Sequence, residues 1–282
     1  MLLLGYALML AACGGGGGTS DTATAQPAAP ATPAAPTAQS IDAQLRSLLE
    51  QNHLTAPAKL VEPDALFNLG LNLFQSPLLS GNRKVSCSSC HPIGNAGLDN
   101  LPLGIGVNGS GSPPNRSGLP VLHRNTPSLI NAMVGGRSFM FWDGRVGYQD
   151  GMFTTPAGDQ LPTGLQSVVA AQALFPLLSR TEMLGDYDPA DVNELAELNP
   201  PGAVVENNPR PVWNGIMARL RADATFSGLL QTAYPGVALE QMDIAFVGNA
   251  LAAYQARRWY DFGATNELHG YIAGTNEISD SA

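Results

Sequence analysis

The sequence predicts an all-α domain with long connecting loops. Apolar residues recur at helical spacing in several segments after residue 40. No run of alternating apolar and polar residues is longer than a few positions, which disfavours an extended sheet. Stretches rich in Gly, Pro and Asn separate the helical segments, and the longest of them, 95–122, indicates a long loop.

The composition is that of a globular protein with an acidic balance. Of the 282 residues, 44% are apolar and 13% are charged, and the formal net charge is -9. Such a chain can bury one large core or two modest ones. The acidic balance argues against nucleic acid as a partner, because phosphate contacts need clustered Lys and Arg, and it suits a basic protein partner better.

The first twelve residues form an apolar run without Lys or Arg that is too short to span a bilayer. Together with Cys13 they end in Leu-Ala-Ala-Cys, which resembles the lipobox of bacterial lipoproteins. We expect 1–12 to be a lipoprotein signal peptide and Cys13 to be lipidated. The chain would then lie on the periplasmic side, held to the membrane only by its lipid anchor. An ordinary signal peptide cleaved nearby is the alternative.

Residues 13–39 are rich in Gly, Ala, Thr and Pro and lack the large apolar residues that a core requires. We predict a flexible tether over 13–39, stiffened locally by its prolines.

Two helical segments open the folded part. The first follows Ser40, a typical N-cap residue, and places Leu45, Leu48 and Leu49 on one face. The second starts at Pro63-Asp64 and repeats Leu66, Leu69 and Leu73 at helical spacing. Gly70 lies within this second segment and would allow a close approach by another helix or by a cofactor. Further helices are predicted at 126–134, 164–178, 212–222 and 239–259.

Between the second helix and the long loop lies the pentapeptide Cys87-Ser88-Ser89-Cys90-His91. Two thiols three positions apart, followed at once by a histidine, are typical of covalent haem attachment. Cys87 and Cys90 would each form a thioether bond to the porphyrin, and His91 would bind the haem iron as its proximal ligand. A disulfide, a thioredoxin-like redox pair and half of a zinc site are the alternatives; no second Cys or His cluster completes a zinc site. The motif therefore predicts one covalent haem c, and the 95–122 loop could wrap its edge.

Several motifs, in a fixed order along the chain, resemble one family. These are 77–80 (PLLS), 124–129 (RNTPSL), 141–145 (FWDGR), 171–176 (AQALFP) and 182–183 (EM). Over about 64–274 the chain resembles the bacterial dihaem cytochrome c peroxidases and their methylamine-utilisation relatives. The resemblance implies a cytochrome c-like haem domain at 40–275, whose haem is the one that reacts with peroxide. It also implies a second haem domain, of which 276–282 would be the start, so we expect a truncated sequence.

In that family hydrogen peroxide is reduced with electrons from a small redox protein, a cytochrome or a cupredoxin. Glu182 matches the family's distal acid-base residue. Cleavage of a peroxide O–O bond needs a proton taken from one oxygen and returned to the leaving one, and a positioned carboxylate can do both. The alternative for Glu182 is a solvated side chain near a helix end.

Trp142 matches the family's tryptophan between the two haems, where an indole could mediate electron transfer. A large aromatic that fills the core beside the porphyrin is the alternative. Asp143 and Arg145, in the same motif, are interpreted as structural rather than catalytic residues.

Two further residues are implied as metal ligands. His123 corresponds to a distal histidine that blocks the iron in the resting enzyme, and a surface or hydrogen-bonded histidine is the alternative. Met133, Met140 and Met183 are other candidates for the sixth iron ligand. Asn125 matches a ligand of a calcium ion whose other ligands would come from the second domain.

Two functions, a peroxidase and an electron carrier, are thus both compatible with the sequence. In the second reading the chain is a monohaem c-type electron-transfer cytochrome, with an iron that is six-coordinate and closed to substrate. A protein-modifying enzyme like the methylamine-utilisation relative is a third reading. A homodimer is also open.

Overall fold

The computed structural model describes residues 40–56, 58–134, 136–190, 192–260, 267–275 and 277. The predicted signal peptide, the tether and Cys13 lie outside these residues, as does all of 276–282 except Glu277. Among the helices described, none is long and apolar enough to cross a membrane.

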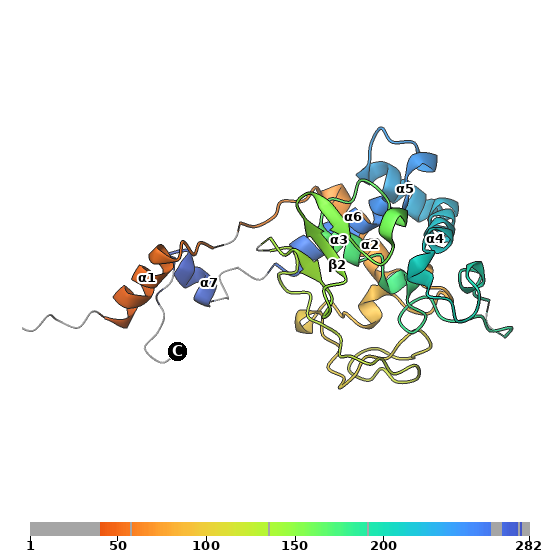
Figure 1. Ribbon diagram of the computed structural model, residues 1–282, viewed down its shortest axis with the longest axis horizontal. Coiled ribbons are helices and arrows are strands. Elements are labelled where there is room, and N and C mark those ends of the chain that lie inside the picture. The colour runs from red at the N-terminus through yellow and green to blue at the C-terminus, as the bar shows by residue number, and fades with distance from the viewer. Residues whose placement is uncertain are drawn as a thin grey trace, which may run out of the picture.

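The described chain is mostly helical, as predicted, and its main body is a cluster of helices with loops below them (Figure 1). The helices are α1 (Ile41–Gln51), α2 (Asp64–Gln75), α3 (Val168–Gln172), α4 (Arg210–Ala222), α5 (Ala224–Ala233), α6 (Ile244–Arg258) and α7 (Glu267–Ile272). Short 3₁₀ turns connect them, among them Cys87–Ser89 and Leu239–Gln241.

Helices α2 and α6 form the centre of the core. Leu69 and Leu73 of α2 are fully buried, and α6 is buried on nearly all sides from Ile244 to Ala256. Gly70 allows the two helices to touch, since a Cβ atom there would lie 2.0 Å from the carbonyl oxygen of Ala250. This confirms the close approach that the sequence predicts for Gly70.

Replacing Gly70 with Ala is expected to destabilise the protein by about 1–3 kcal/mol, because the added methyl group overpacks the α2–α6 contact. Gly228 of α5 is a matched control, since a Cβ atom there meets nothing within 4 Å. Gly228→Ala should instead stabilise the protein by about 0.4–1 kcal/mol. Thermal unfolding of both variants measures the difference, and equal midpoints would contradict the packing.

A small antiparallel sheet corrects the all-α prediction. Strands β1 (Phe139–Met140), β2 (Val146–Gln149) and β3 (Met152–Thr154) pair in the order β1-β2-β3, and α3 packs against the first two. These strands have two to four residues, too few for an alternating pattern to stand out. The turn between β2 and β3 carries a local signal that the prediction missed. Asp150 and Gly151 both have positive φ, at 52° and 79°, as a two-residue hairpin turn requires.

The predicted helices are confirmed at 41–51, 64–75 and 210–222, and Ser40 caps α1 by accepting a hydrogen bond from the amide of Ala43. The prediction at 126–134 is wrong, because this segment forms turns and Asn131 has a φ of 54°. Of 164–178 only α3 and a short 3₁₀ turn at 176–178 are helical, so the predicted helix is too long. The predicted helix 239–259 breaks at Asp243, which caps α6 instead. Helix α5 was not predicted.

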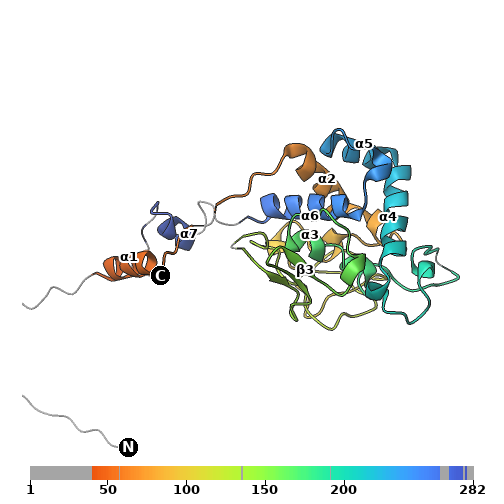
Figure 2. The ribbon, with the colours of Figure 1, turned by 45° about the horizontal axis from the view of Figure 1, so that its top comes forward.

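Helices α1 and α7 lie side by side, away from the other helices, in both views (Figures 1 and 2). The hydroxyl group of Tyr271 donates a hydrogen bond to the carbonyl of Asp42 over 3.1 Å, and the guanidinium of Arg46 lies 4.6 Å from the Tyr271 ring centre. The two ends of the described chain therefore contact one another.

Candidate functional site

The Cys87–His91 segment forms one tight turn. The amides of Cys90 and His91 both bond to the carbonyl of Cys87, over 3.2 and 2.8 Å. Ahead of the turn, the amide of Ser86 donates to the hydroxyl group of Ser89 over 3.0 Å. Both cysteines are free and half-buried, so the disulfide alternative is excluded in this structure.

His91 is oriented by a backbone carbonyl. Its Nδ1 lies 2.9 Å from the carbonyl oxygen of Gly97, a hydrogen bond that leaves Nε2 as the nitrogen free to bind iron. Burial lowers the pKa of His91, although the Gly97 bond and the charge of Asp99 oppose this shift. A neutral imidazole with a fixed ring is the form that binds a metal ion. The residue that orients it, Gly97, was not foreseen from the sequence.

The thiols have the opposite character from a redox pair. Burial raises the pKa of Cys87 to about 12 and that of Cys90 to about 11. A thioredoxin-like pair depends on a lowered thiol pKa, which makes one sulfur a thiolate. The turn thus disfavours the redox-pair alternative, while two thiols and a free imidazole nitrogen on one turn fit a covalently held haem.

An aromatic cluster covers the side of the turn that faces α2 and α6. The ring centre of Phe74 lies 6.4 Å from that of His91 and 5.2 Å from that of Trp259. Tyr254 completes the cluster, 5.0 Å from Phe74 and 5.3 Å from Trp259. These buried rings support the histidine side of the site with rigid apolar surface.

The segment Ile105–Val107 joins the haem-binding turn to the segment that carries Glu182. The carbonyl of Ile105 lies 3.6 Å from the sulfur of Cys90, and two residues later the amide of Val107 donates to the carbonyl of Thr181 over 3.1 Å. Gly106 makes this approach feasible, since a Cβ atom there would lie 1.9 Å from the Thr181 oxygen. Glu182 follows directly, so the structure brings it to the same site as Cys90.

The side chain of Arg116 also holds the segment Ile105–Val107 in place. It is 5% exposed, and its guanidinium donates to the carbonyls of Ile105 and Gly106 over 3.2 and 2.8 Å. Its positive charge lowers the pKa of Cys90, against the larger effect of burial. No sequence pattern indicated this buried arginine.

Glu182 is half-buried and its carboxyl group is electrostatically coupled to several neighbours. Burial raises its pKa, the charge of Arg145 lowers it and the charge of Glu206 raises it. The negative charge of Glu182 also raises the pKa of Cys90, which shows that the two side chains lie within electrostatic range. This environment differs from that of a solvated side chain near a helix end, which was the alternative for Glu182.

Arg145 organises the acidic side of the site. Its guanidinium bonds to the carboxylate of Asp143 over 3.1 Å, lies 3.9 Å from the carboxylate of Glu206 and sits 3.7 Å from the ring centre of Phe141. Asp143 and Arg145 therefore have the structural roles that the sequence predicted. The influence of Arg145 on Glu182 is additional and was missed.

Trp142 lies on the surface rather than in the core. It is 69% exposed, and the guanidinium of Arg124 stacks 3.6 Å from its ring centre. The core-filling alternative is therefore wrong for the described domain. A stacked arginine fixes the indole plane at the surface, where another protein surface can reach it.

The remaining candidates differ in their burial. His123 and Asn125 are exposed, and His123 has no hydrogen bond or ion pair within the described ranges. Met183 is buried in the core, while Met133 and Met140 are partly buried against it. Within the portion of the chain that is described, no group of three or more His, Cys, Asp or Glu side chains could hold a metal ion. Calcium binding at Asn125 stays a prediction.

Comparisons with known proteins point to one family. The sequence model described as di-haem cytochrome c peroxidase matches residues 64–262. A 77-residue segment is 36% identical to the cytochrome c551 peroxidase of Pseudomonas aeruginosa, covering 27% of this chain and 19% of that protein. A 100-residue segment is 31% identical to the cytochrome c551 peroxidase of Nitrosomonas europaea, covering 35% of this chain and 26% of that protein.

Solved structures give a weaker likeness. A MauG-like protein associated with microbial copper homeostasis is 22% identical, with a TM-score of 0.46, over 78% of this chain and 47% of that one. The chain thus spans less than half the length of these relatives in each alignment.

Proposed function

This chain belongs to the di-haem cytochrome c peroxidase family, and we propose that it binds a haem c at Cys87, Cys90 and His91 and reduces hydrogen peroxide there. The observation that supports this most is the link from Cys90 through Ile105–Val107 to Thr181, which brings a half-buried carboxyl group beside the haem-binding turn.

In this proposal the chain's own residues divide the work. Cys87 and Cys90 hold the cofactor, and His91, oriented by the carbonyl of Gly97, binds the iron through Nε2. The bound haem would supply the electrons that cleave the peroxide O–O bond. Glu182 accepts a proton from one peroxide oxygen and returns it to the other, so that the second oxygen leaves as water.

The partial burial of Glu182 suits a group that must both take and give a proton. A carboxyl pKa raised toward neutral pH favours proton transfer in either direction. The positive charge of Arg145 opposes this rise in the pKa of Glu182.

Replacing Arg145 with Met is expected to raise the pKa of Glu182 further, because the positive charge that lowers this pKa is removed. The base form of Glu182 exists above its pKa, so the acid limb of the pH–rate profile should move to higher pH. Arg137, an exposed arginine in the loop before β1, provides the matched control Arg137→Met. A limb that stays in place, or moves to lower pH, in the Arg145 variant would count against this role.

The proposed function is tested by peroxide consumption in the full-length, haem-loaded protein supplied with a reduced small cytochrome or cupredoxin. We expect donor oxidation that depends on peroxide, with two donor electrons consumed for each peroxide molecule. If the donors transfer electrons to the haem but peroxide is not consumed, the electron-carrier reading replaces this one.

We also propose that Trp142 lies on the route by which electrons reach this haem, because it is exposed and held flat by Arg124. We further propose that the protein works on the periplasmic side, anchored through Cys13. The apolar run before Cys13 supports this location.

A further inference from the structure

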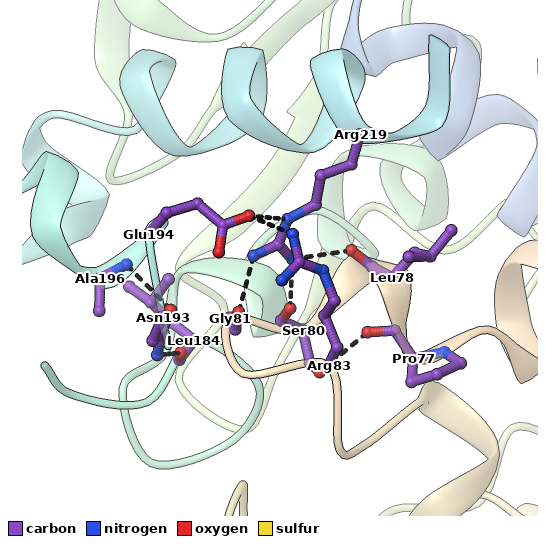
Figure 3. A network of polar contacts seen from close by, with 10 residues as sticks. All are labelled: Pro77, Leu78, Ser80, Gly81, Arg83, Leu184, Asn193, Glu194, Ala196 and Arg219. Carbon is purple, nitrogen blue, oxygen red and sulfur yellow. Dashed lines mark hydrogen bonds and ion pairs between the residues drawn. The ribbon is translucent and has the colours of Figure 1, made fainter. Parts of the chain in front are cut away.

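Arg219 of α4 is largely buried and bonds to a loop far from it in sequence (Figure 3). Its side chain is 7% exposed. Nη1 donates to the carbonyls of Leu78 and Ser80 over 3.0 and 2.5 Å, and Nη2 donates to the carbonyl of Gly81 over 2.7 Å. One guanidinium group therefore holds the chain between α2 and the haem-binding turn.

Glu194 completes the charge balance of this cluster. Its carboxylate accepts a hydrogen bond from Nε of Arg219 over 2.8 Å and also pairs with Arg83. Burial opposes ionisation of Glu194, but the bond to Arg219 and the charges of Arg219 and Arg83 outweigh it and lower the pKa of Glu194. The buried arginine is thus paired, which the burial of a charge requires.

The loop held by Arg219 in turn holds the residues that follow Glu182. The amide of Gly81 donates to the carbonyl of Met183 over 2.8 Å. A Cβ atom at Gly81 would lie 1.8 Å from the carbonyl oxygen of Leu184, so the two segments are in direct backbone contact. On the other side of Glu182, Thr181 is held by Val107.

Asn193, next to Glu194 in the chain, reaches the same segment. It is 2% exposed, and its Nδ2 donates to the carbonyl of Leu184 over 2.7 Å. Its Oδ1 accepts a bond from the amide of Ala196 over 3.1 Å. Figure 3 shows Asn193 and Leu184 beside Gly81, with Arg219 and Glu194 above them. Both ends of the Arg219–Glu194 pair therefore lead to the segment 183–185.

We propose that Arg219 is a positioning residue for Glu182, acting through the carbonyls of Ser80 and Gly81 and through its pair with Glu194. This inference rests on the proposed function, since it assigns Arg219 to the same proton-transfer step. Displacement of a catalytic group by about 1 Å can cost about 10²-fold in rate, so a residue outside the site can control it.

The geometry requires arginine rather than lysine. Arg219 bonds to three carbonyls and one carboxylate at once through three separate nitrogens. A lysine offers three donors on a single atom and cannot span the same acceptors.

The test uses full-length, haem-loaded protein with Arg219→Met and with Arg221→Met as the matched control. Arg221 lies on the same helix and also bonds to backbone carbonyls, but to those of Leu239 and Met242, over 3.1 and 2.6 Å. Amide hydrogen exchange at Gly81 and at 183–185 and the rate of reaction with peroxide are measured in both. We expect faster exchange and a rate lower by about 10–100-fold in Arg219→Met alone.

The double variant Glu182→Gln/Arg219→Met separates positioning from general support. If Arg219 acts only through Glu182, the double variant reacts no more slowly than Glu182→Gln alone. Additive losses, or exchange at Gly81 equal to that in the Arg221 variant, would overturn the proposal. Should Arg219→Met fail to fold, Arg219→Lys is expected to show the same changes at smaller size.

The exchange measurement keeps this inference separate from the proposed function. If Glu182→Gln reacts with peroxide as fast as the wild type, the acid-base role of Glu182 in the proposed function fails. Faster exchange at 183–185 in the Arg219 variant would then show that Arg219 holds this segment in the wild type without any effect on catalysis. The positioning proposal would fail in that case too. If amide exchange stays slow in both arginine variants while Glu182→Gln loses its reaction with peroxide, only the positioning role of Arg219 is rejected.

Discussion

Replacing Glu182 with Gln is expected to slow the reaction with peroxide by about 10²–10⁴-fold, the usual contribution of a positioned acid-base group. The amide keeps the size of the side chain and its hydrogen-bonding capacity, but it cannot accept and return a proton at neutral pH. Haem attachment should be unchanged, because Cys87 and His91 lie on a separate turn. Stopped-flow mixing of the reduced protein with peroxide measures the rate.

Glu197 provides the charge-matched control for this variant. It is exposed in a neighbouring short turn, and Glu197→Gln removes the same charge without touching the site. The control should react like the wild type. If both variants slow equally, loss of net negative charge explains the effect and Glu182 is not the acid-base group.

Replacing Cys87 and Cys90 together with Ala is expected to abolish covalent haem attachment. The thiols are the only groups on the turn that can form thioether bonds, and single variants should each retain one bond. Haem held by two thioether bonds and haem held by one differ in the α-band of the pyridine haemochrome, which is measured after extraction with acidified acetone. The double variant should leave no haem in the protein fraction.

Ser88→Ala is the control for this prediction, because it alters the same turn and leaves both sulfurs in place. The Ser88 hydroxyl group contacts that of Ser86 at 2.8 Å, so the variant removes one of the turn's own hydrogen bonds. It should retain haem. Haem that stays covalently bound in the double-cysteine variant would show attachment at another position.

The helices could be predicted where sequence signals were local. Ser40 and Pro63-Asp64 mark the starts of α1 and α2, and the buried face of α2 follows from its spacing of leucines. The helix expected at 239–259 was too long because Asp243, a typical N-cap residue, was read as part of the pattern. The sheet is not predicted because its strands, such as the four residues of β2, are too short for an alternation of apolar and polar residues to be recognised.

The site divides in the same way. The haem-binding turn consists of five consecutive residues, so its chemistry could be predicted from the sequence. Glu182 could be found only through resemblance to a family, since a single glutamate has no pattern of its own. Gly81 and Val107 bond to the residues on either side of Glu182, and Arg145 lowers its pKa. All three reach this segment through loops whose paths depend on tertiary packing. No periodicity in the chain encodes such contacts.

The most direct test of the account is the absorption spectrum of the reduced, haem-loaded protein before and after addition of carbon monoxide. We expect a high-spin ferrous haem with His91 as its only protein ligand, which binds carbon monoxide and is oxidised by peroxide. A low-spin spectrum that neither carbon monoxide nor peroxide changes would show an iron closed by a second protein ligand. That result would contradict a peroxide site and identify an electron carrier.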